Sequence, residues 1–387
     1  MTEWPTGRGR RSAIVAQFGD ARADLVGSAL TTGDLLADAV VTEIHERGPE
    51  VRAALRQGVE HGLSSLNDPP PAVAALLEQA ETLPDYVDDD LFDRAPLPQY
   101  SMPNAVHMIS LSAGALVRVY QSPSIAKVLA TTGRLIDGAP RRLAGTGKWV
   151  RIANLPGSMR RGEPGYVATL QVRMLHAHMR RLARTRGFDD AVDGVPINQV
   201  DLARTWMDFT VTSFRAEAAM GFDLNSNERA SLYRYWWYIA HVLGVDARLV
   251  EGIASNDEAQ RVDDLLAAVT GPLIPESGTL ALATLKTIAG LLHEILNVPE
   301  NIGLPGMFAL TRRFHGDPHC DELGLPKATA VDALLTPAIH AVRLSRSRRR
   351  RDPDAWAAEQ RRQIAAGRAV TEQPAEATGY EREAVLF

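Results

Sequence analysis

The stretch Arg173-Met174-Leu175-His176-Ala177-His178-Met179-Arg180 predicts the helix around which the rest of the chain is organised. At 3.6 residues per turn, Arg173, His176 and Arg180 fall within a narrow arc of one helix face, whereas His178 points roughly the opposite way. An apolar stripe runs beside His176 and consists of Val172, Leu175, Met179 and Leu182. The stretch therefore places one imidazole at the edge of a buried stripe, with a guanidinium one turn above it and another one turn below.

This arrangement is compatible with a cofactor site. A neutral imidazole in an apolar wall suits a metal ion or a haem iron. The flanking Arg173 and Arg180 suit the carboxylates of a bound cofactor. The same pattern is also typical of a core histidine between solvated arginines, which is the commoner case for an isolated histidine of this kind.

The composition is that of an ordinary globular protein. The 387 residues are 45% apolar and 23% charged, which is enough for a large core. The net charge of -5 carries no nucleic-acid signature. The single cysteine, Cys320, excludes an internal disulfide framework and any multi-cysteine metal site.

The chain shows no convincing signal for export or for crossing a membrane. The apolar run after Arg10-Arg11 is too short for a secretory signal. Our inspection finds no window close to the roughly 20 apolar residues that span a bilayer. We therefore expect a cytoplasmic protein.

Helical periodicity prevails along the chain, and few segments alternate with period two. The prediction is an all-α fold of about a dozen helices. One of them is an aromatic-rich helix over Arg229–Leu243, with a cap at Asn225–Glu228 and a stop at Gly244. Three parts are expected: a polar, weakly structured lead-in over 1–30, a single helical domain over 31–345, and a basic then polar tail over 346–387.

Three further features are candidates for function. Arg142 and Thr146 are spaced i, i+4 and share a helix face, so they can donate hydrogen bonds to bound oxygen or position an acid–base water; the alternative is an exposed pair. His241 is a polar contact in a cofactor pocket or, as we favour, a satisfied core group. The six arginines between Arg343 and Arg351 are a solvated tail or, less commonly, a contact with an anionic membrane surface.

Other catalytic motifs are absent or incomplete in the sequence. His293 begins a metalloprotease-like motif, but Asn297 stands where the second histidine is required. There is no glycine-rich nucleotide loop and no Gly-x-Ser-x-Gly elbow. The ligand-rich loop over 315–322 lacks an identifiable fourth ligand for structural zinc.

Three blocks in order resemble a known family. The first runs from Thr131–Leu135 through Arg142–Val150. The second is Arg173-x-x-His176-x-x-x-Arg180, and the third is Tyr235-Trp236-x-x-Ile239-x-His241-x-x-Gly244-Val245. Together they resemble the rubber oxygenase (latex clearing protein) and MpaB oxygenase catalytic-domain family, over roughly residues 35–345.

The resemblance implies a b-type haem protein with a globin-like helical core. It implies that His176 is the proximal iron ligand. Arg173 and Arg180 flank it as part of the cofactor-binding signature, together with His241. The resemblance also implies that Arg142 and Thr146 lie on the distal side. The implied reaction uses dioxygen to cleave a carbon–carbon double bond in an isoprenoid-like chain, with oxygen taken up by each of the two carbonyl products.

The sequence departs from the family pattern in two places. Gly145 stands where rubber oxygenases carry a lysine directly before the distal threonine, and no acidic residue lies near Ala126, where they carry a proposed catalytic glutamate. These departures, and the lack of an export signal, favour a smaller apolar substrate than polyisoprene. They leave open a non-catalytic haem or lipid carrier, a haem enzyme with another oxidation, and a non-haem metal site using His176 with His178 or His241. The oligomeric state is also open.

Overall fold

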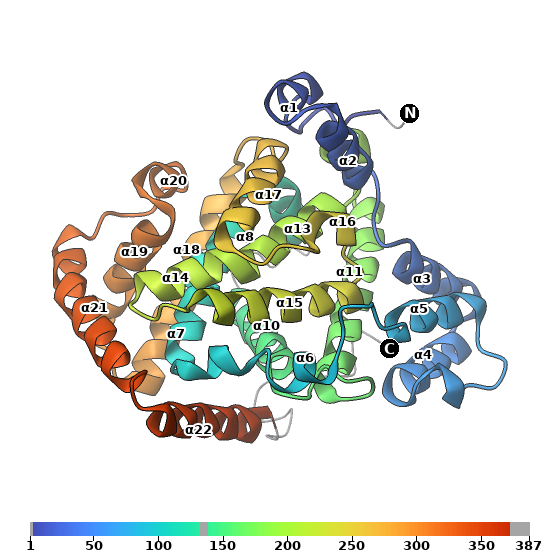
Figure 1. Cartoon of the computed structure of the whole chain (residues 1–387). Coiled ribbons are helices and arrows are strands. Elements are labelled where there is room, and N and C mark those ends of the chain that lie inside the picture. The colour runs from blue at the N-terminus through green and yellow to red at the C-terminus, as the bar shows by residue number, and fades with distance from the viewer. Residues whose placement is uncertain (1–2, 132–137, 372–387) are drawn as a thin grey trace.

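The computed structural model describes residues 3–131 and 138–371. Within these ranges the regular structure consists of helices, with no strand, so the prediction of an all-α fold is confirmed. Figure 1 shows α15 crossing the middle of the molecule, with α3, α4 and α5 at one edge and α21 and α22 at the opposite edge. The site described below lies on α10 and α11, between these two edges.

The bounds of the helices in chain order are α1 (Arg11–Phe18), α2 (Asp20–Leu30), α3 (Leu35–Arg47), α4 (Pro49–His61), η1 (Leu63–Ser65), α5 (Pro71–Glu81), α6 (Asp89–Asp93), η2 (Leu97–Ser101), α7 (Asn104–Ile109), η3 (Ser110–Leu116), α8 (Val117–Val119), α9 (Pro123–Ala130), α10 (Ala139–Ala153), α11 (Pro164–Thr185), α12 (Asp190–Asp193), α13 (Gln199–Met207), η4 (Asp208–Thr212), α14 (Ser213–Ala219), α15 (Ser226–Leu243), α16 (Ala247–Val250), α17 (Asn256–Ala268), α18 (Pro275–Leu296), α19 (Glu300–His315), α20 (Asp317–Glu322), α21 (Thr329–Arg349) and α22 (Pro353–Thr371).

The expected number of about a dozen helices was too low. Several short helices, such as α12 and α16, are too brief to show a hydrophobic period. A second reason is that the segment from Gln199 to Ala219 is divided into α13, the π-helical turn η4 and α14. A π-turn adds a residue to the helix without breaking it, so periodicity alone does not reveal it.

The prediction of a weakly structured lead-in is wrong for residues 11–30, which form α1 and α2. Ile14 and Val26 are buried in the core. Before these helices, the buried guanidinium of Arg8 donates two hydrogen bonds, of 3.1 and 3.0 Å, to the carboxylate of Asp201 on α13. The N-terminal segment is therefore anchored to the centre of the domain.

The favoured interpretation of the C-terminal arginines as a solvated tail is also wrong for part of the run. Arg346 is buried and donates a 2.6 Å hydrogen bond to the carbonyl of Ser101. Its guanidinium lies between the rings of Phe222 and Trp356, at 4.9 and 5.0 Å from their centroids. This contact fixes α22 against η2, with which it packs extensively. Residues 372–387 of the predicted tail lie outside the described ranges.

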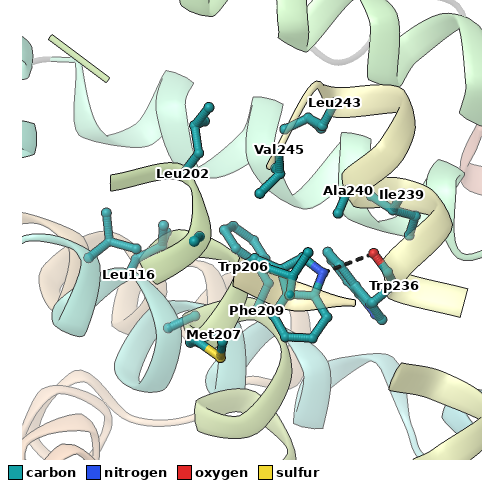
Figure 2. Packing of buried hydrophobic residues seen from close by; sticks show 14 of the residues in the cluster. Leu116, Leu202, Trp206, Met207, Phe209, Trp236, Ile239, Ala240, Leu243 and Val245 are labelled. Atoms are coloured by element: carbon teal, nitrogen blue, oxygen red, sulfur yellow. Dashed lines mark hydrogen bonds between the residues drawn. The ribbon is translucent and has the colours of Figure 1, made fainter. Parts of the chain in front are cut away.

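The aromatic helix is confirmed as α15, together with its predicted ends. Asn225 and Glu228 form a reciprocal capping box at its start. Gly244 ends it in the left-handed conformation, with φ +77°. Figure 2 shows Trp236 from this helix beside Phe209, and Trp206 donating its indole N–H to the carbonyl of Trp236 at 2.9 Å. These rings form the apolar layer beneath α10.

Two described segments are long and apolar enough to cross a membrane by length and composition, namely Asp20–Arg47 and Pro275–Leu296. This differs from our inspection of the sequence, which found no such window. Both segments are partly buried in the protein, and core helices of globular proteins pass the same test. The cytoplasmic location stays a prediction.

Candidate oxygenase site

The site is built on the hairpin of α10 and α11. At the closed end of the hairpin, a Cβ placed on Gly165 would lie 3.0 Å from the Cα of Ala153. One turn further along, the indole N–H of Trp149 donates to the hydroxyl of Thr169 at 3.1 Å. From the first contact to the second, the contacting residue on α10 lies four positions earlier in the chain, and the contacting residue on α11 lies four positions later. The two helices are therefore antiparallel and in fixed register.

Extending this register by seven residues along each helix brings Arg142 level with His176. Seven residues correspond to nearly two turns, so Arg142 projects from about the same face of α10 as Trp149, and His176 from about the same face of α11 as Thr169. Thr146 lies on that face of α10, one turn closer to the hairpin connection. Arg142, Thr146 and His176 are all half-buried. The register therefore places Arg142 and Thr146 on the face of α10 that turns toward α11, and their approach to His176 stays a prediction. Thr132–Leu135 of the first block lie outside the described ranges.

His176 is held as a neutral imidazole. Burial, together with the positive charge of Arg180, lowers its pKa from 6.5 to about 4, against the opposing effect of Asp34. Its Nδ1 atom is buried and has no hydrogen-bond partner within residues 3–131 and 138–371. A buried polar atom without a partner is rare in proteins, and a missing ligand is one of its recognised explanations.

The apolar stripe beside His176 does not close over it. Its members keep part of their surface accessible: they are Val172, Leu175, Met179 and Leu182. His176 likewise keeps accessible surface although its surroundings are strongly desolvating. These residues form a partly accessible apolar face of α11 beside the strongly desolvated His176. His176 is the residue on this face that would hold a haem iron.

Arg173 uses its guanidinium within the protein. It donates to both oxygens of the buried Asp34 carboxylate at 2.6 and 3.0 Å. It also donates to the Gln79 side chain at 2.6 Å and to the carbonyl of Val242 at 3.2 Å. A Cβ on Gly244 would lie 2.5 Å from an oxygen of Asp34, so the glycine at the end of α15 leaves room for the pair. These contacts occupy the guanidinium within the protein, and the predicted contact of Arg173 with a cofactor carboxylate stays a prediction.

Arg180 has an equivalent partner on α3. Its Nε donates to both oxygens of Asp38, at 2.7 and 3.0 Å, and its Nη1 donates to the carbonyl of Ile197 at 3.1 Å. Burial nevertheless raises the pKa of Asp38, against the opposing effect of Arg180. The two arginines thus bind carboxylates of the protein and hold α11 against α3, while Nη2 of Arg180 is buried without a hydrogen-bond partner in the described residues.

Sequence reasoning missed these partners. Asp34, Asp38 and Gln79 were not singled out, although two signals were present in the sequence. Asp34 precedes a helical pattern, as a capping residue does, and its side chain accepts a hydrogen bond from the backbone of Ala37. Asp34 and Asp38 are also one turn apart, a spacing that matches two charges on a facing helix.

His241 lies on the Arg173 side of α11. The amide of Gln79 contacts its ring nitrogens at 3.4 Å and its carbonyl at 3.3 Å, and its ring stacks on Tyr238 with centroids 6.0 Å apart. Burial and the charge of Arg173 lower its pKa. These contacts favour the interpretation of His241 as a satisfied core group.

His178 lies on roughly the opposite face of α11 from His176. Burial lowers its pKa, and so do His45 on α3 and Arg52 on α4, which places its ring toward those two helices. No group of three or more His, Cys, Asp or Glu side chains able to hold a metal ion occurs in the described part of the chain. The non-haem metal interpretation therefore has no ligand set among these residues.

The depressed pKa of His176 makes the stability of the cofactor-free protein depend on pH. Below pH 6.5 the unfolded chain binds a proton on this imidazole, whereas the folded chain does so only near pH 4. Stability therefore falls as the pH falls through this window, by up to about 3 kcal/mol for His176. His315, whose pKa is also lowered to about 4, adds a similar decrease.

We expect His176→Leu to remove the part of this pH dependence that His176 causes. The part that His315 causes should remain. The measurement is urea unfolding of the wild type and of the variant between about pH 7 and about pH 4. Equal losses of stability in the two proteins would show that His176 is not held neutral by the fold.

The comparisons with known proteins agree with this geometry. Residues 102–346 match the family model described as ER-bound oxygenase mpaB/B'/Rubber oxygenase, catalytic domain. This match covers more than half of the chain and includes α10, α11 and α15. The chain belongs to this family.

Members of the rubber oxygenase and MpaB family include the curated rubber oxygenase of Streptomyces sp. (strain K30). It is 24% identical to the chain over 312 residues, which are 78% of this chain and 73% of the relative. A solved structure of latex clearing protein LCP in the closed state shares the fold, with a TM-score of 0.61 at 20% identity. The match covers 87% of this chain and 91% of that one. The chain therefore carries an oxygenase catalytic domain.

Proposed function

We propose that this family member is a haem b-dependent oxygenase that acts on an apolar, isoprenoid-like substrate by oxidative cleavage of a carbon–carbon double bond. The observation that carries the proposal is the neutral His176 beside the apolar stripe of α11, whose Nδ1 is buried without a partner among the described residues. A neutral imidazole in an apolar wall fits the proximal ligand of a haem iron. Haem, when bound, would supply the activation of dioxygen.

The residues of this chain would divide the work as follows. His176 on α11 would hold the iron. Arg142 and Thr146 on α10 would donate hydrogen bonds to oxygen atoms that become more negative during the reaction. Leu175 and Met179 exclude water and contact the apolar substrate. In a cleavage of this kind, each carbonyl product receives one atom of dioxygen, so no further oxidant is required.

The Arg173–Asp34 and Arg180–Asp38 pairs position the iron ligand. They hold α11 against α3 from the same face of α11 as His176, one turn on either side of it, so they limit the movement of the imidazole. Gly145 and the lack of an acidic residue over 121–135 leave the site without the lysine and glutamate of rubber oxygenases. We therefore assign no catalytic base and favour a substrate smaller than polyisoprene.

Oxygen uptake by the haem-loaded protein tests the reaction. Squalene, a carotenoid and short oligo-isoprenes are the substrates, and carbonyl products are identified by mass spectrometry. Arg142→Ala is expected to lower turnover by about a hundredfold, because a donor to developing negative charge is lost. Arg141→Ala changes the exposed neighbouring arginine and is expected to leave turnover unchanged.

The outcomes separate the proposed enzyme from its alternatives. Loss of turnover in both variants would indicate general damage to α10. Oxygen uptake without cleaved products would indicate a different oxidation by the same haem site. Tight haem binding without oxygen uptake on the whole substrate panel would favour the non-catalytic carrier, which the missing lysine and glutamate also suggest.

A further inference from the structure

Exposed apolar side chains are concentrated at one edge of the molecule. Of the seven large apolar residues that are exposed in the described ranges, five lie on α18, α19 and α21. They are Ile295, Leu296, Ile302, Leu334 and Leu344. Ile295 is 60% exposed and Leu334 is 73% exposed, which is costly for side chains of this size unless something covers them.

The packing of α19 against α21 brings these residues onto one surface. Arg313, near the end of α19, forms an ion pair with Asp332 and donates to the hydroxyl of Thr336 at 2.5 Å, both near the start of α21. The two helices pack against each other and are joined by the short helix α20, so they run antiparallel. Ile302 lies eleven residues before Arg313 on α19. The turn of α21 that contains Leu344 lies eleven residues after the turn with Asp332 and Thr336, so this register places Ile302 beside Leu344.

The outward face of α21 continues this apolar surface. Residues three, four and seven apart share a helix face. One exposed face of α21 is formed in this way by Leu334, Pro337, Ala338, Ala341, Leu344, Ser345 and Arg348. It contains no acidic residue, because the single acidic residue of α21, Asp332, lies on the other side and pairs with Arg313. We refer to this face, together with Ile295, Leu296 and Ile302, as the α19–α21 edge.

Basic charge lies at one end of the α19–α21 edge. Arg348 and Arg351 are exposed and form no ion pair within the described residues. By contrast, Arg343, Arg349 and Arg350 pair with Asp223, Glu359 and Glu228. The last turn of α18 carries the exposed Glu294, and the exposed Asp352 and Asp354 follow Arg351 in the chain. The positive charge of the surface is therefore that of Arg348 and Arg351 at the end of α21.

We infer that the α19–α21 edge docks on a membrane surface that contains anionic lipid, with its apolar residues in the interface and Arg348 and Arg351 at the headgroups. An apolar helix face flanked by arginines is the pattern of a helix that lies in the membrane interface. A second copy of the chain fits less well, because a two-fold contact centred on the basic end would bring like charges together. In Figure 1 this edge is the one formed by α21, away from α3, α4 and α5.

Vesicle flotation of the full chain tests the inference. The probes are vesicles of phosphatidylcholine alone and vesicles of phosphatidylcholine with an equal share of phosphatidylglycerol. The wild type is expected to bind the anionic vesicles. Ile302→Glu/Leu344→Glu is expected to weaken this binding by about a hundredfold, because two apolar side chains no longer enter the interface. Arg348→Gln/Arg351→Gln is expected to weaken binding to anionic vesicles by at least about tenfold and to leave binding to neutral vesicles unchanged.

Leu35→Glu/Leu83→Glu is the matched control, since it places the same charges on exposed leucines elsewhere, at 74% and 55% exposure. Thermal unfolding checks that each variant is folded. Absence of wild-type binding, or equal loss in the control, would overturn the inference. A dimer in sedimentation that Ile302→Glu/Leu344→Glu dissociates, without vesicle binding by the wild type, would assign the edge to a second copy and also overturn it. The measurement needs no haem and no substrate, so it is independent of the proposed function.

Discussion

Replacing Arg173 with methionine is expected to lower the free energy of unfolding by about 3–5 kcal/mol, because it leaves a buried carboxylate without its counter-ion. The carboxylate of Asp34 is almost fully buried and accepts two hydrogen bonds from the guanidinium. The same change leaves the side-chain oxygen of Gln79 and the carbonyl of Val242 without these donors. Few single changes in this chain remove as many interactions at once.

Urea unfolding followed by circular dichroism measures this loss. Arg181→Met, on the same helix but exposed, is the control and is expected to change stability by less than about 0.5 kcal/mol. Arg173→Met/Asp34→Asn removes the unpaired charge while keeping a capping side chain, so it is expected to regain part of the loss. If Arg173→Met unfolded like the wild type, the pair would not be what holds α11 against α3.

The second large effect concerns the cofactor. His176→Ala is expected to abolish stable haem binding, because the apolar face of α11 then keeps no side chain able to hold the iron. His178→Ala is expected to retain haem, because that ring lies on the opposite face of α11, where His45 and Arg52 act on it. The two histidines are two residues apart, so the comparison separates the loss of a ligand from the loss of any imidazole on α11.

Much of the fold could be predicted from the sequence. The capping box at Asn225 and the glycine stop at Gly244 define α15 through local chemistry that depends on few neighbours. The two ends of the chain could not be predicted in this way. Arg8 and Arg346 are buried only because residues far along the chain, Asp201 and Ser101, accept their hydrogen bonds. A charged residue gives no local signal that it will be buried.

Only part of the candidate site could be proposed from the sequence, because the other part depends on partners far along the chain. Helix geometry on α11 separates His176 from His178, and the spacing of Arg142 and Thr146 places them on one face of α10. The roles of Arg173 and Arg180 depended on partners from α3, which no spacing within α11 reveals. Both arginines bind carboxylates of the protein, those of Asp34 and Asp38, and the cofactor contact predicted for them stays a prediction.

The ultraviolet–visible spectrum of the purified chain after haem reconstitution tests the central claim most directly. The account predicts a Soret band in the wild type and in His178→Ala, and no bound haem in His176→Ala. A wild type that stays colourless would contradict the haem proposal. A His176→Ala variant with an unchanged Soret band would contradict the assignment of His176 as the iron ligand.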